Sequence, residues 1–474
     1  MEQATPINSE QISPTIFIIC GVTGDLAQRK LLPALLSLYT KKLLPRKFKI
    51  VGFSRREFTD QDFRLFLREE MNINHNLYRP EDIHRFLNNV VYQQGQFDAT
   101  VAYENLAKRL AKIDELEFMQ CSNKLFHLSV APSFYETILG QLSKSGLSIP
   151  CGGNLGWTRV LVEKPFGNDT ETAKKLDALL GTLFKEEQIF RIDHYFAKEA
   201  LQNVLAFRFS NSLFEPLWNN KHIECVHIQL LEKIGIEGRG NFYDGVGALK
   251  DVGQNHILAM LALLAMNRPE TFDAPSIRKE RAIVLKNLRA INSKNIRGSV
   301  VRGQYLGYVQ EPGVSKTSST ETYFQLQAFV DTRAWKGVPF YLESGKGLSE
   351  NKAEISIYFK DTTGEDKTNI LSFRIQPDEA IKIRFWVKKP GFGMQTEAKT
   401  LGFNYKDSHS PQSIPDAYER VLYDAILGDQ TLFTSTDEIK YAWKFITPII
   451  DSWRMLPLEK YQRGSRGPEI TQSS

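Results

Sequence analysis

The sequence has few cysteines, and none of them are grouped. The four stand apart at Cys20, Cys121, Cys151 and Cys225. They lack the close pairs that bind a metal and the number that a disulfide framework needs. Cysteine usage of this kind is typical of proteins kept in a reducing compartment. We therefore expect a cytoplasmic location.

Long apolar runs and a large charge excess are also missing. No segment approaches the roughly 20 apolar residues that a membrane-spanning helix needs. The first fourteen residues are polar and carry Glu2 and Glu10, so they lack the features of a signal peptide. Sixty Lys and Arg against 55 Asp and Glu leave a net charge of +5, with the basic residues scattered. We expect neither a membrane nor a nucleic acid as partner.

What remains is the composition of an ordinary globular protein, with 42% hydrophobic and 24% charged residues. A chain of 474 residues is long enough for two or three domains, each with its own core. There are no internal repeats and no low-complexity linker. The domain boundary has to be inferred from a change in the hydrophobic pattern.

A nucleotide-binding pattern follows the first apolar segment. Residues 15–20 (TIFIIC) are apolar and mostly β-branched, which predicts a strand buried on both faces of a parallel sheet. Glycine at 21 and 24 and alanine at 27 then give the spacing G-x-x-G-x-x-A. That spacing predicts a tight turn, a close backbone approach to a pyrophosphate, and a small residue where helix meets strand. Residues 26–42 are predicted to be helical, with Pro33 at a kink or near the beginning.

Two arginines follow the second predicted strand, residues 48–53. A guanidinium at Arg55 suits the 2′-phosphate of NADP, whereas a cofactor without that phosphate usually meets an acid there. The alternative is that Arg55 and Arg56 are solvated surface residues. A further strand is predicted over residues 124–130, and Tyr135 behind it either stacks on a nicotinamide or caps the core.

Residues 159–162 are predicted to be a strand that delivers Lys164 into the ligand crevice at the carboxyl edge of the sheet. Pro165 restricts the backbone of that lysine. A crossover helix over residues 170–185 and a strand over 188–191 follow. They lead into residues 191–199, which combine an acid, a histidine and a lysine (RIDHYFAKE).

We expect Asp193 to begin a helix whose first turn is residues 194–199. His194 and Lys198 would then share one face beside free backbone N–H groups, an arrangement suited to a phosphate. The alternative is that Asp193 only caps the helix and His194 is a surface histidine.

The pattern changes after about residue 200. Segments 324–330, 355–359, 371–375 and 381–387 alternate apolar and polar residues, which predicts antiparallel strands covered on one side. The other face suits a subunit interface, because it carries several large aromatic residues, namely Tyr323, Phe329, Tyr358 and Trp386. Helices are predicted over residues 251–266, 416–427 and 437–446. On the first of these, polar neighbours surround His256, which argues against a core histidine that merely bonds a carbonyl.

The predicted fold is an α/β Rossmann-type N-terminal domain, residues 1–195, plus an α+β C-terminal domain, residues 196–474, with a large, mainly antiparallel sheet. Three stretches together resemble glucose-6-phosphate dehydrogenases, namely 21–30 (GVTGDLAQRK), 163–167 (EKPFG) and 191–199. Further stretches match in the family's order: 237–240 (EGRG), 251–256 (DVGQNH), 345–346 (GK), 415–420 (PDAYER) and 464–468 (GSRGP).

The resemblance implies an enzyme of the oxidative pentose phosphate pathway. It would oxidise glucose 6-phosphate to 6-phosphoglucono-lactone with NADP, or more weakly with NAD, as a homodimer or homotetramer. His256 would be the general base and Asp193 its carboxylate partner, since an imidazole titrates near neutral pH. Substrate binding would fall to Lys164, His194, Tyr195, Lys198, Glu232, Asp251 and Lys346. Cofactor binding would fall to Gly21, Val22, Thr23, Gly24, Asp25, Leu26, Ala27, Lys30, Arg55, Tyr135 and Lys164. No metal is expected.

The chain departs from the family pattern at two places. Ala197 stands where the family usually has glycine, which matters if that position needs a positive φ or a close substrate approach. Glu343, Asn351 and Ser356 replace basic residues of a second, structural NADP site of some members, so a second bound NADP is not expected. Two other functions stay open: a non-catalytic NADP-binding sensor or scaffold, and a dehydrogenase of another sugar.

Overall fold

The computed structural model describes residues 12–74, 76–152, 155–408 and 414–468, so part of the polar N-terminal segment lies outside the described residues. The chain forms two compact units. The first comprises Met1–Gly167, Glu171–Ala197 and Pro415–Thr436, and the second comprises Asn168–Thr170, Lys198–Ile414 and Asp437–Ser474. A late segment of the chain is therefore part of the first unit, which the sequence pattern did not reveal.

The first unit is built on a seven-stranded sheet of order β15-β6-β5-β4-β1-β2-β3. Six of its strands are parallel and β15 runs antiparallel beside β6. The bounds are β1 Thr15–Cys20, β2 Phe48–Ser54, β3 Val90–Gln94, β4 Asn123–Leu128, β5 Thr158–Val162, β6 Ile189–Ile192 and β15 Phe433–Thr434. The strands predicted near β1, β2, β4, β5 and β6 are confirmed, while β3 and β15 were not predicted.

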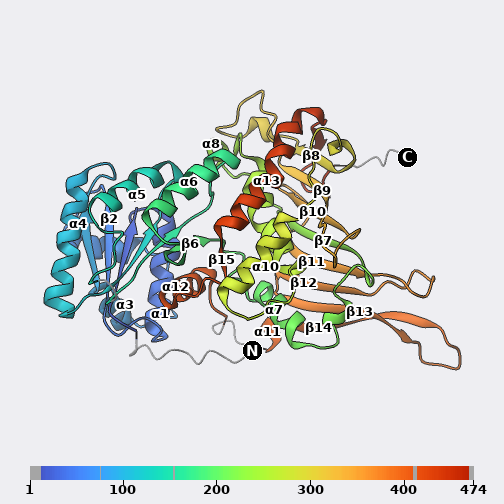
Figure 1. The fold of residues 1–474 in the computed structure, drawn as a ribbon, viewed down its shortest axis with the longest axis horizontal. Helices are drawn as coiled ribbons and strands as arrows, with labels where there is room; N and C mark the ends of the chain where they lie inside the picture. Colours follow the sequence, from blue (N-terminus) through green and yellow to red (C-terminus); the bar gives the residue numbers. More distant parts are fainter. Residues whose placement is uncertain (1–11, 75, 153–154, 409–413, 469–474) are drawn as a thin grey trace. The chain divides into compact units, whose positions relative to one another are not determined.

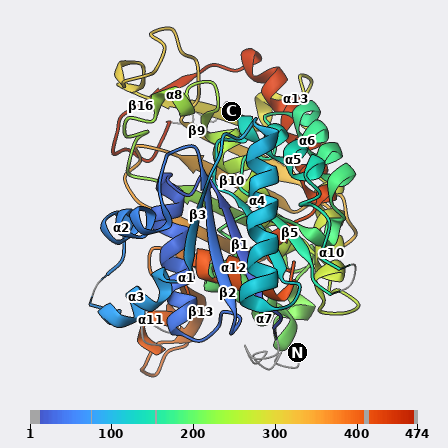
Figure 2. The ribbon, with the colours of Figure 1, turned by 90° about the vertical axis from the view of Figure 1, so that its left-hand side faces the viewer.

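Helices cover both faces of this sheet, which explains why β1 is buried along its whole length. Side chains of α1, α2, α3 and α12 share one apolar cluster with Phe17 and Ile19 of β1. On the opposite face, Tyr103 of α4 packs edge-on against Phe53 of β2 at 5.2 Å, and α4 stands in front of the strands in Figure 2. The bounds are α1 Leu32–Thr40, α2 Asp60–Glu70, α3 Pro80–Leu87, α4 Thr100–Ile113, α5 Tyr135–Lys144, α6 Thr170–Leu183 and α12 Ala417–Leu427.

The first predicted helix has a mixed geometry. It starts with a π-helical turn over Ala27–Leu31 that runs directly into α1, so Pro33, the second residue of α1, lies inside a continuous helix and leaves one backbone N–H out of it. The predicted end of α12 is also confirmed. Asp416 caps its first turn, and Gly428 ends it in the left-handed conformation with φ +85°.

The second unit is built on a nine-stranded sheet of order β14-β13-β12-β11-β7-β10-β9-β8-β16. Only β10 with β7 and β16 with β8 pair in parallel, so the prediction of a mainly antiparallel sheet is confirmed. The bounds are β7 Ile223–Leu231, β8 Val300–Tyr305, β9 Tyr323–Phe329, β10 Pro339–Gly345, β11 Lys352–Phe359, β12 Ile370–Gln376, β13 Ala380–Lys388, β14 Thr396–Asn404 and β16 Glu459–Tyr461.

Helices pack against this sheet and against one another. Phe207 of α7 meets Phe373 of β12 edge-on at 5.4 Å, and α7 and α10 lie beside the strands in Figure 1. Arg281 of α10 and Glu438 of α13 form an ion pair with an Nε to Oε1 distance of 2.8 Å, and both side chains are almost fully buried. The bounds are α7 Glu199–Ser210, α8 Gly240–Tyr243, α9 Leu258–Ala265, α10 Ala274–Lys286, α11 Tyr405–Ser408 and α13 Thr436–Ser452.

One covalent feature was not predicted from the cysteines. Cys121 and Cys151, 30 residues apart in sequence, form a disulfide with a Cα–Cα distance of 5.7 Å, while Cys20 and Cys225 are free. Their wide spacing concealed this pairing, because Cys121 precedes β4 and Cys151 precedes the neighbouring strand β5. Within the described part of the chain, the structure contains no helix that is both long and apolar enough to cross a membrane.

Candidate active site

The glycine turn after β1 has a shape that only glycine allows. Gly21 has φ +84°, and a Cβ atom there would lie 2.4 Å from the carbonyl oxygen of Ser129. Its N–H donates to Phe53 O at 2.8 Å, and the Gly24 N–H donates back to Gly21 O at 2.9 Å. Glycine thus lets the turn pack closely on the residues that follow β4, at the carboxyl edge of the parallel sheet, where dinucleotides bind. These residues fit the pyrophosphate of a dinucleotide.

The end of β2 lies beside this turn. Thr23 Oγ1 and Ser54 Oγ are 2.9 Å apart, which ties the turn to the residue that precedes Arg55. The Arg55 side chain is exposed and directly follows the second strand of the sheet, the place near which dinucleotide-binding domains meet the ribose of their cofactor. Lys30, on the π-helical turn, is half-exposed and lies 3.7 Å from Asp416 Oδ2.

Lys164 follows the end of β5, and the residue between them, Glu163, is contacted by Tyr135 and His127. Tyr135 is buried, and its hydroxyl donates to the carbonyl oxygen of Glu163 at 2.9 Å. Burial raises the pKa of Tyr135, so the hydroxyl keeps its proton. The Glu163 carboxylate lies 3.4 Å from Nε2 of His127 on β4. The sequence pattern did not reveal this contact, because His127 lies within the apolar strand β4.

Arg191, at the end of β6, has a structural role in the first unit. It is buried and reaches Asp177 Oδ1 at 2.7 Å and Glu186 Oε2 at 2.9 Å. Paired in this way, the guanidinium fixes the strand from which residues 193–198 emerge.

The expected helical turn over residues 194–199 is wrong. Asp193 Oδ1 accepts from the Tyr195 N–H at 3.0 Å, and its carbonyl accepts from Phe196 N–H at 3.1 Å, so a turn closes here instead. Helix α7 begins only at Glu199, with Lys198 as its N-cap residue. His194 and Lys198 therefore do not share a face of one helix, and His194 instead packs against Tyr195 at 5.1 Å.

Ala197 lies within this turn and is almost completely buried. It is not among the residues with positive φ, so its conformation does not require the glycine that the family usually has. Its side chain belongs to the apolar cluster of the first unit. Alanine therefore fits this backbone.

In the second unit, the structure brings Glu232 and Lys346 together. They follow the parallel neighbours β7 and β10, so both lie at the carboxyl ends of these strands. Lys346 Nζ forms an ion pair with Glu232 Oε2, and the Glu232 N–H donates to Gly345 O at 2.9 Å. A buried lysine next to a carboxylate provides both donors and an acceptor for sugar hydroxyls.

Asp251 and His256 lie on an unusual helix. The predicted helix over residues 251–266 is α-helical only in its second part, because Leu249–Ile257 are π-helical and α9 follows. The Asn255 side chain donates to Asp251 O at 3.0 Å and accepts from the His256 N–H at 2.7 Å. π-Helical segments are frequent at functional sites. His256 itself is buried.

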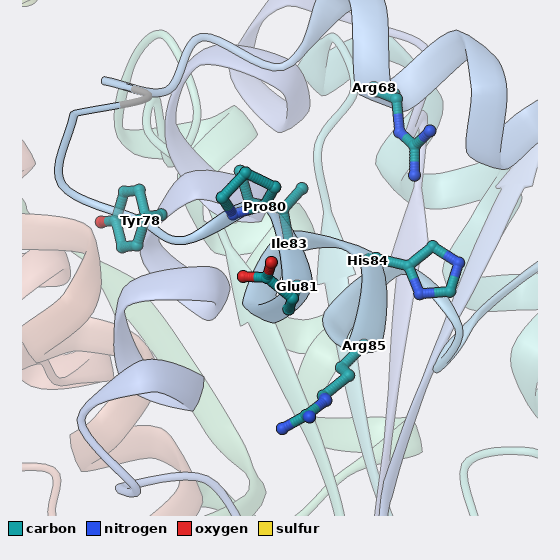
Figure 3. Close-up of a pocket in the computed structure, with 7 residues that line it drawn as sticks. All are labelled: Arg68, Tyr78, Pro80, Glu81, Ile83, His84 and Arg85. Carbon is teal, nitrogen blue, oxygen red and sulfur yellow. The ribbon is translucent and has the colours of Figure 1, made fainter.

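A pocket of about 610 Å³ lies elsewhere in the first unit, between α2 and α3 (Figure 3). The Arg64 side chain of α2 donates to the carbonyl oxygen of Val90, the first residue of β3. The pocket region therefore lies near the amino ends of the strands. The glycine turn lies at their carboxyl ends. The charged ends of Arg68 and Arg85 point in different directions in Figure 3. None of the predicted site residues lines this pocket.

Comparisons with known proteins agree with this geometry. The sequence matches two family models, "Glucose-6-phosphate dehydrogenase, NAD binding domain" over residues 18–203 and "Glucose-6-phosphate dehydrogenase, C-terminal domain" over residues 205–474. A glucose-6-phosphate 1-dehydrogenase of Borreliella burgdorferi is 40% identical, over 98% of this chain and 97% of that protein.

Solved structures resemble the chain over nearly its whole length. A glucose-6-phosphate dehydrogenase in complex with its substrate glucose-6-phosphate has a TM-score of 0.90 at 32% identity, covering 97% of this chain and 96% of that one. The enzyme from Mycobacterium avium has a TM-score of 0.82 at 31% identity, covering 96% of each chain. With both family models and a full-length relative in agreement, the chain belongs to the glucose-6-phosphate dehydrogenase family.

Proposed function

We propose that this chain oxidises glucose 6-phosphate to 6-phosphoglucono-lactone by hydride transfer from carbon one to NADP, the first step of the oxidative pentose phosphate pathway. The observation that carries this function is family membership along 98% of the chain. The protein is an oxidoreductase that acts on a CH–OH group, and NADP is its cofactor. NADP, when bound, supplies the hydride acceptor.

For cofactor binding, we assign the pyrophosphate to the turn from Gly21 to Ala27 and the 2′-phosphate to Arg55. Lys30 adds positive charge on the same side of the sheet, Tyr135 supports the strand end, and Lys164 contacts both cofactor and substrate. Since Arg55 has no role with a cofactor that lacks the 2′-phosphate, NAD should serve only weakly.

For substrate binding, the phosphate is held by His194, Tyr195 and Lys198. The sugar hydroxyls are bound by Lys164 and by three residues of the second unit, Glu232, Asp251 and Lys346. This division places residues 1–195 mainly with the cofactor and residues 196–474 mainly with the substrate. The Glu232–Lys346 ion pair supports it, because the two groups hold each other in place before the sugar arrives.

His256 accepts the proton of the carbon-one hydroxyl as hydride leaves, and Asp193 supplies the carboxylate that orients the imidazole and stabilises its charged form. The neutral imidazole suits this task because its ordinary pKa lies near neutral pH. Holding sugar and acceptor in reacting geometry supplies much of the remaining acceleration.

Replacing Lys198 with alanine should weaken glucose 6-phosphate binding by about 10²-fold, the order expected for losing a charge-assisted hydrogen bond to phosphate. NADP binding should stay unchanged. Titration calorimetry with each ligand measures both, and Lys221→Ala, which removes an exposed lysine, is the matched control. Wild-type affinity for glucose 6-phosphate in Lys198→Ala would remove this residue from the phosphate site.

The function itself is tested by following the absorbance of reduced cofactor with glucose 6-phosphate and NADP, then with NAD, and then with unphosphorylated glucose. Turnover that needs both the phosphate and NADP is the expected result. Turnover of unphosphorylated glucose in place of glucose 6-phosphate would favour the alternative function, a dehydrogenase of another sugar. Binding of NADP without turnover of any sugar phosphate would favour a sensor or scaffold.

We infer a homodimer, or a dimer of dimers, formed through the large sheet of a cytoplasmic protein. Large apolar side chains on and beside β13 and β14 are exposed, notably Phe392, Met394 and Leu401, and exposed apolar groups of this kind favour a partner. Tyr323, which the sequence pattern placed on the interface, is instead buried with its hydroxyl donating to Glu343 at 2.8 Å. Light scattering at micromolar concentration should give at least twice the chain mass of 54.2 kDa; a monomeric mass would refute the dimer.

A further inference from the structure

Tyr243 lies in α8 and is almost completely buried, with 2% of its surface exposed. Among the residues that the structure describes, its hydroxyl has no hydrogen-bond partner. A buried hydroxyl without a partner costs free energy that a phenylalanine at the same place would not. Such a group in a native fold calls for an explanation.

The tyrosines packed around Tyr243 make the contrast plain, because each has a satisfied hydroxyl. Tyr308 meets Tyr243 edge-on at 6.3 Å and bonds Asp244 at 3.2 Å. Tyr305 bonds Glu311 at 3.1 Å, and Tyr461 donates to the carbonyl oxygen of Lys346 at 2.7 Å. Within this cluster, Tyr243 is therefore the exception. Loose packing of the whole cluster does not explain its unpaired hydroxyl.

The surroundings of Tyr243 link it to the substrate groups of the second unit. The ammonium group of Lys346 lies 5.5 Å from the centre of the Tyr243 ring, and Lys346 in turn pairs with Glu232. Tyr243 also precedes the π-helical segment that carries Asp251 by only a few residues. The ring that carries the orphan hydroxyl thus lies close to residues that we assign to the sugar.

We propose that Tyr243 is a further substrate-binding residue, whose hydroxyl hydrogen-bonds one of the hydroxyl groups on carbons two to four of the sugar ring held by Lys346 and Glu232. This assignment rests on the proposed function, since it names an additional contact in the same sugar site. It explains why the protein keeps a tyrosine there: the hydroxyl lacks a partner only until the sugar supplies one.

The electrostatics support a hydroxyl that stays protonated. Burial, followed by the nearby carboxylates of Glu321 and Asp251, raises the pKa of Tyr243 well above its ordinary value. Glu321 has other partners, because it accepts from Leu249 N–H at 3.0 Å and from the Trp453 indole at 3.1 Å. Tyr243 therefore remains able both to donate to a sugar oxygen and to accept from a sugar hydroxyl.

The test is Tyr243→Phe, which removes one oxygen atom and keeps the ring. The KM for glucose 6-phosphate should rise about tenfold, the order of one lost hydrogen bond to substrate, with KM for NADP unchanged. The melting temperature should stay level or rise, because the orphan group is gone. The matched control is Tyr308→Phe, which should lower the melting temperature and leave KM for glucose 6-phosphate near that of the wild type.

Analogues that lack one ring hydroxyl identify the contact. With 2-deoxy, 3-deoxy and 4-deoxy glucose 6-phosphate, the penalty of Tyr243→Phe should vanish for the one analogue whose missing hydroxyl met the tyrosine. An unchanged KM in an active Tyr243→Phe protein would overturn the inference, as would an equal penalty with all three analogues. Because the wild type is the reference in each assay, failure of the proposed function would show there first, as absence of turnover.

Discussion

His256→Asn should lower kcat by about 10²–10⁴-fold, the usual contribution of a general base. Asparagine keeps a polar side chain of similar size but cannot take up the proton of the carbon-one hydroxyl at neutral pH. Binding of glucose 6-phosphate and NADP should stay largely intact, since the contacts that we propose for the phosphate and the cofactor do not include the imidazole. Turnover measured under saturating conditions, together with calorimetry for each ligand, separates the two effects.

The matched control for this variant is His222→Asn. His222 is exposed and outside the candidate site, so its replacement should leave kcat within twofold of the wild type. A near-normal kcat in His256→Asn would refute the assignment of the base. A large loss of substrate affinity without a change in kcat would make His256 a binding residue instead.

Glu438→Ala should reduce the stability of the second unit by about 3–5 kcal/mol, because it leaves a buried guanidinium without its carboxylate. Arg281 and Glu438 have side chains 0% and 2% exposed, and a second contact joins Arg281 Nη2 to Glu438 Oε2 at 3.2 Å. The pair connects α10 to α13. A fall in the urea denaturation midpoint of the second unit measures the loss.

An exposed ion pair provides the control for that variant. Arg289 and Asp331 are 2.6 Å apart, but their side chains are 48% and 45% exposed, so Asp331→Ala should cost no more than about 1 kcal/mol. Replacing both buried partners, as Arg281→Met with Glu438→Leu, should recover much of the stability lost in Glu438→Ala. Equal effects of the buried and exposed single changes would contradict this account of the packing.

The elements that the sequence predicted best are those whose pattern is set locally. An apolar strand that runs into Gly21 and Gly24 specifies both β1 and the turn, since steric rules alone favour glycine there. Asp416 and Gly428 marked the two ends of α12 through cap chemistry. The alternating segments of the second unit likewise predicted its sheet.

Long-range contacts were beyond the sequence pattern. A periodicity of residues cannot show that β15, a two-residue strand, joins the sheet of the first unit, or that Cys121 meets Cys151. The turn over residues 194–197 was missed because an Asp side chain supports a helix N-terminus and an isolated turn equally well. The orphan hydroxyl of Tyr243 is defined by what surrounds it, so only the structure shows it.

The central claim is direct hydride transfer from carbon one of glucose 6-phosphate to NADP. It is tested by supplying glucose 6-phosphate with deuterium at carbon one and measuring the mass of the reduced cofactor by mass spectrometry. Transfer in one step predicts reduced NADP that is one mass unit heavier, with no deuterium in the solvent. Unlabelled reduced cofactor, or no reduced cofactor at all, would contradict the account.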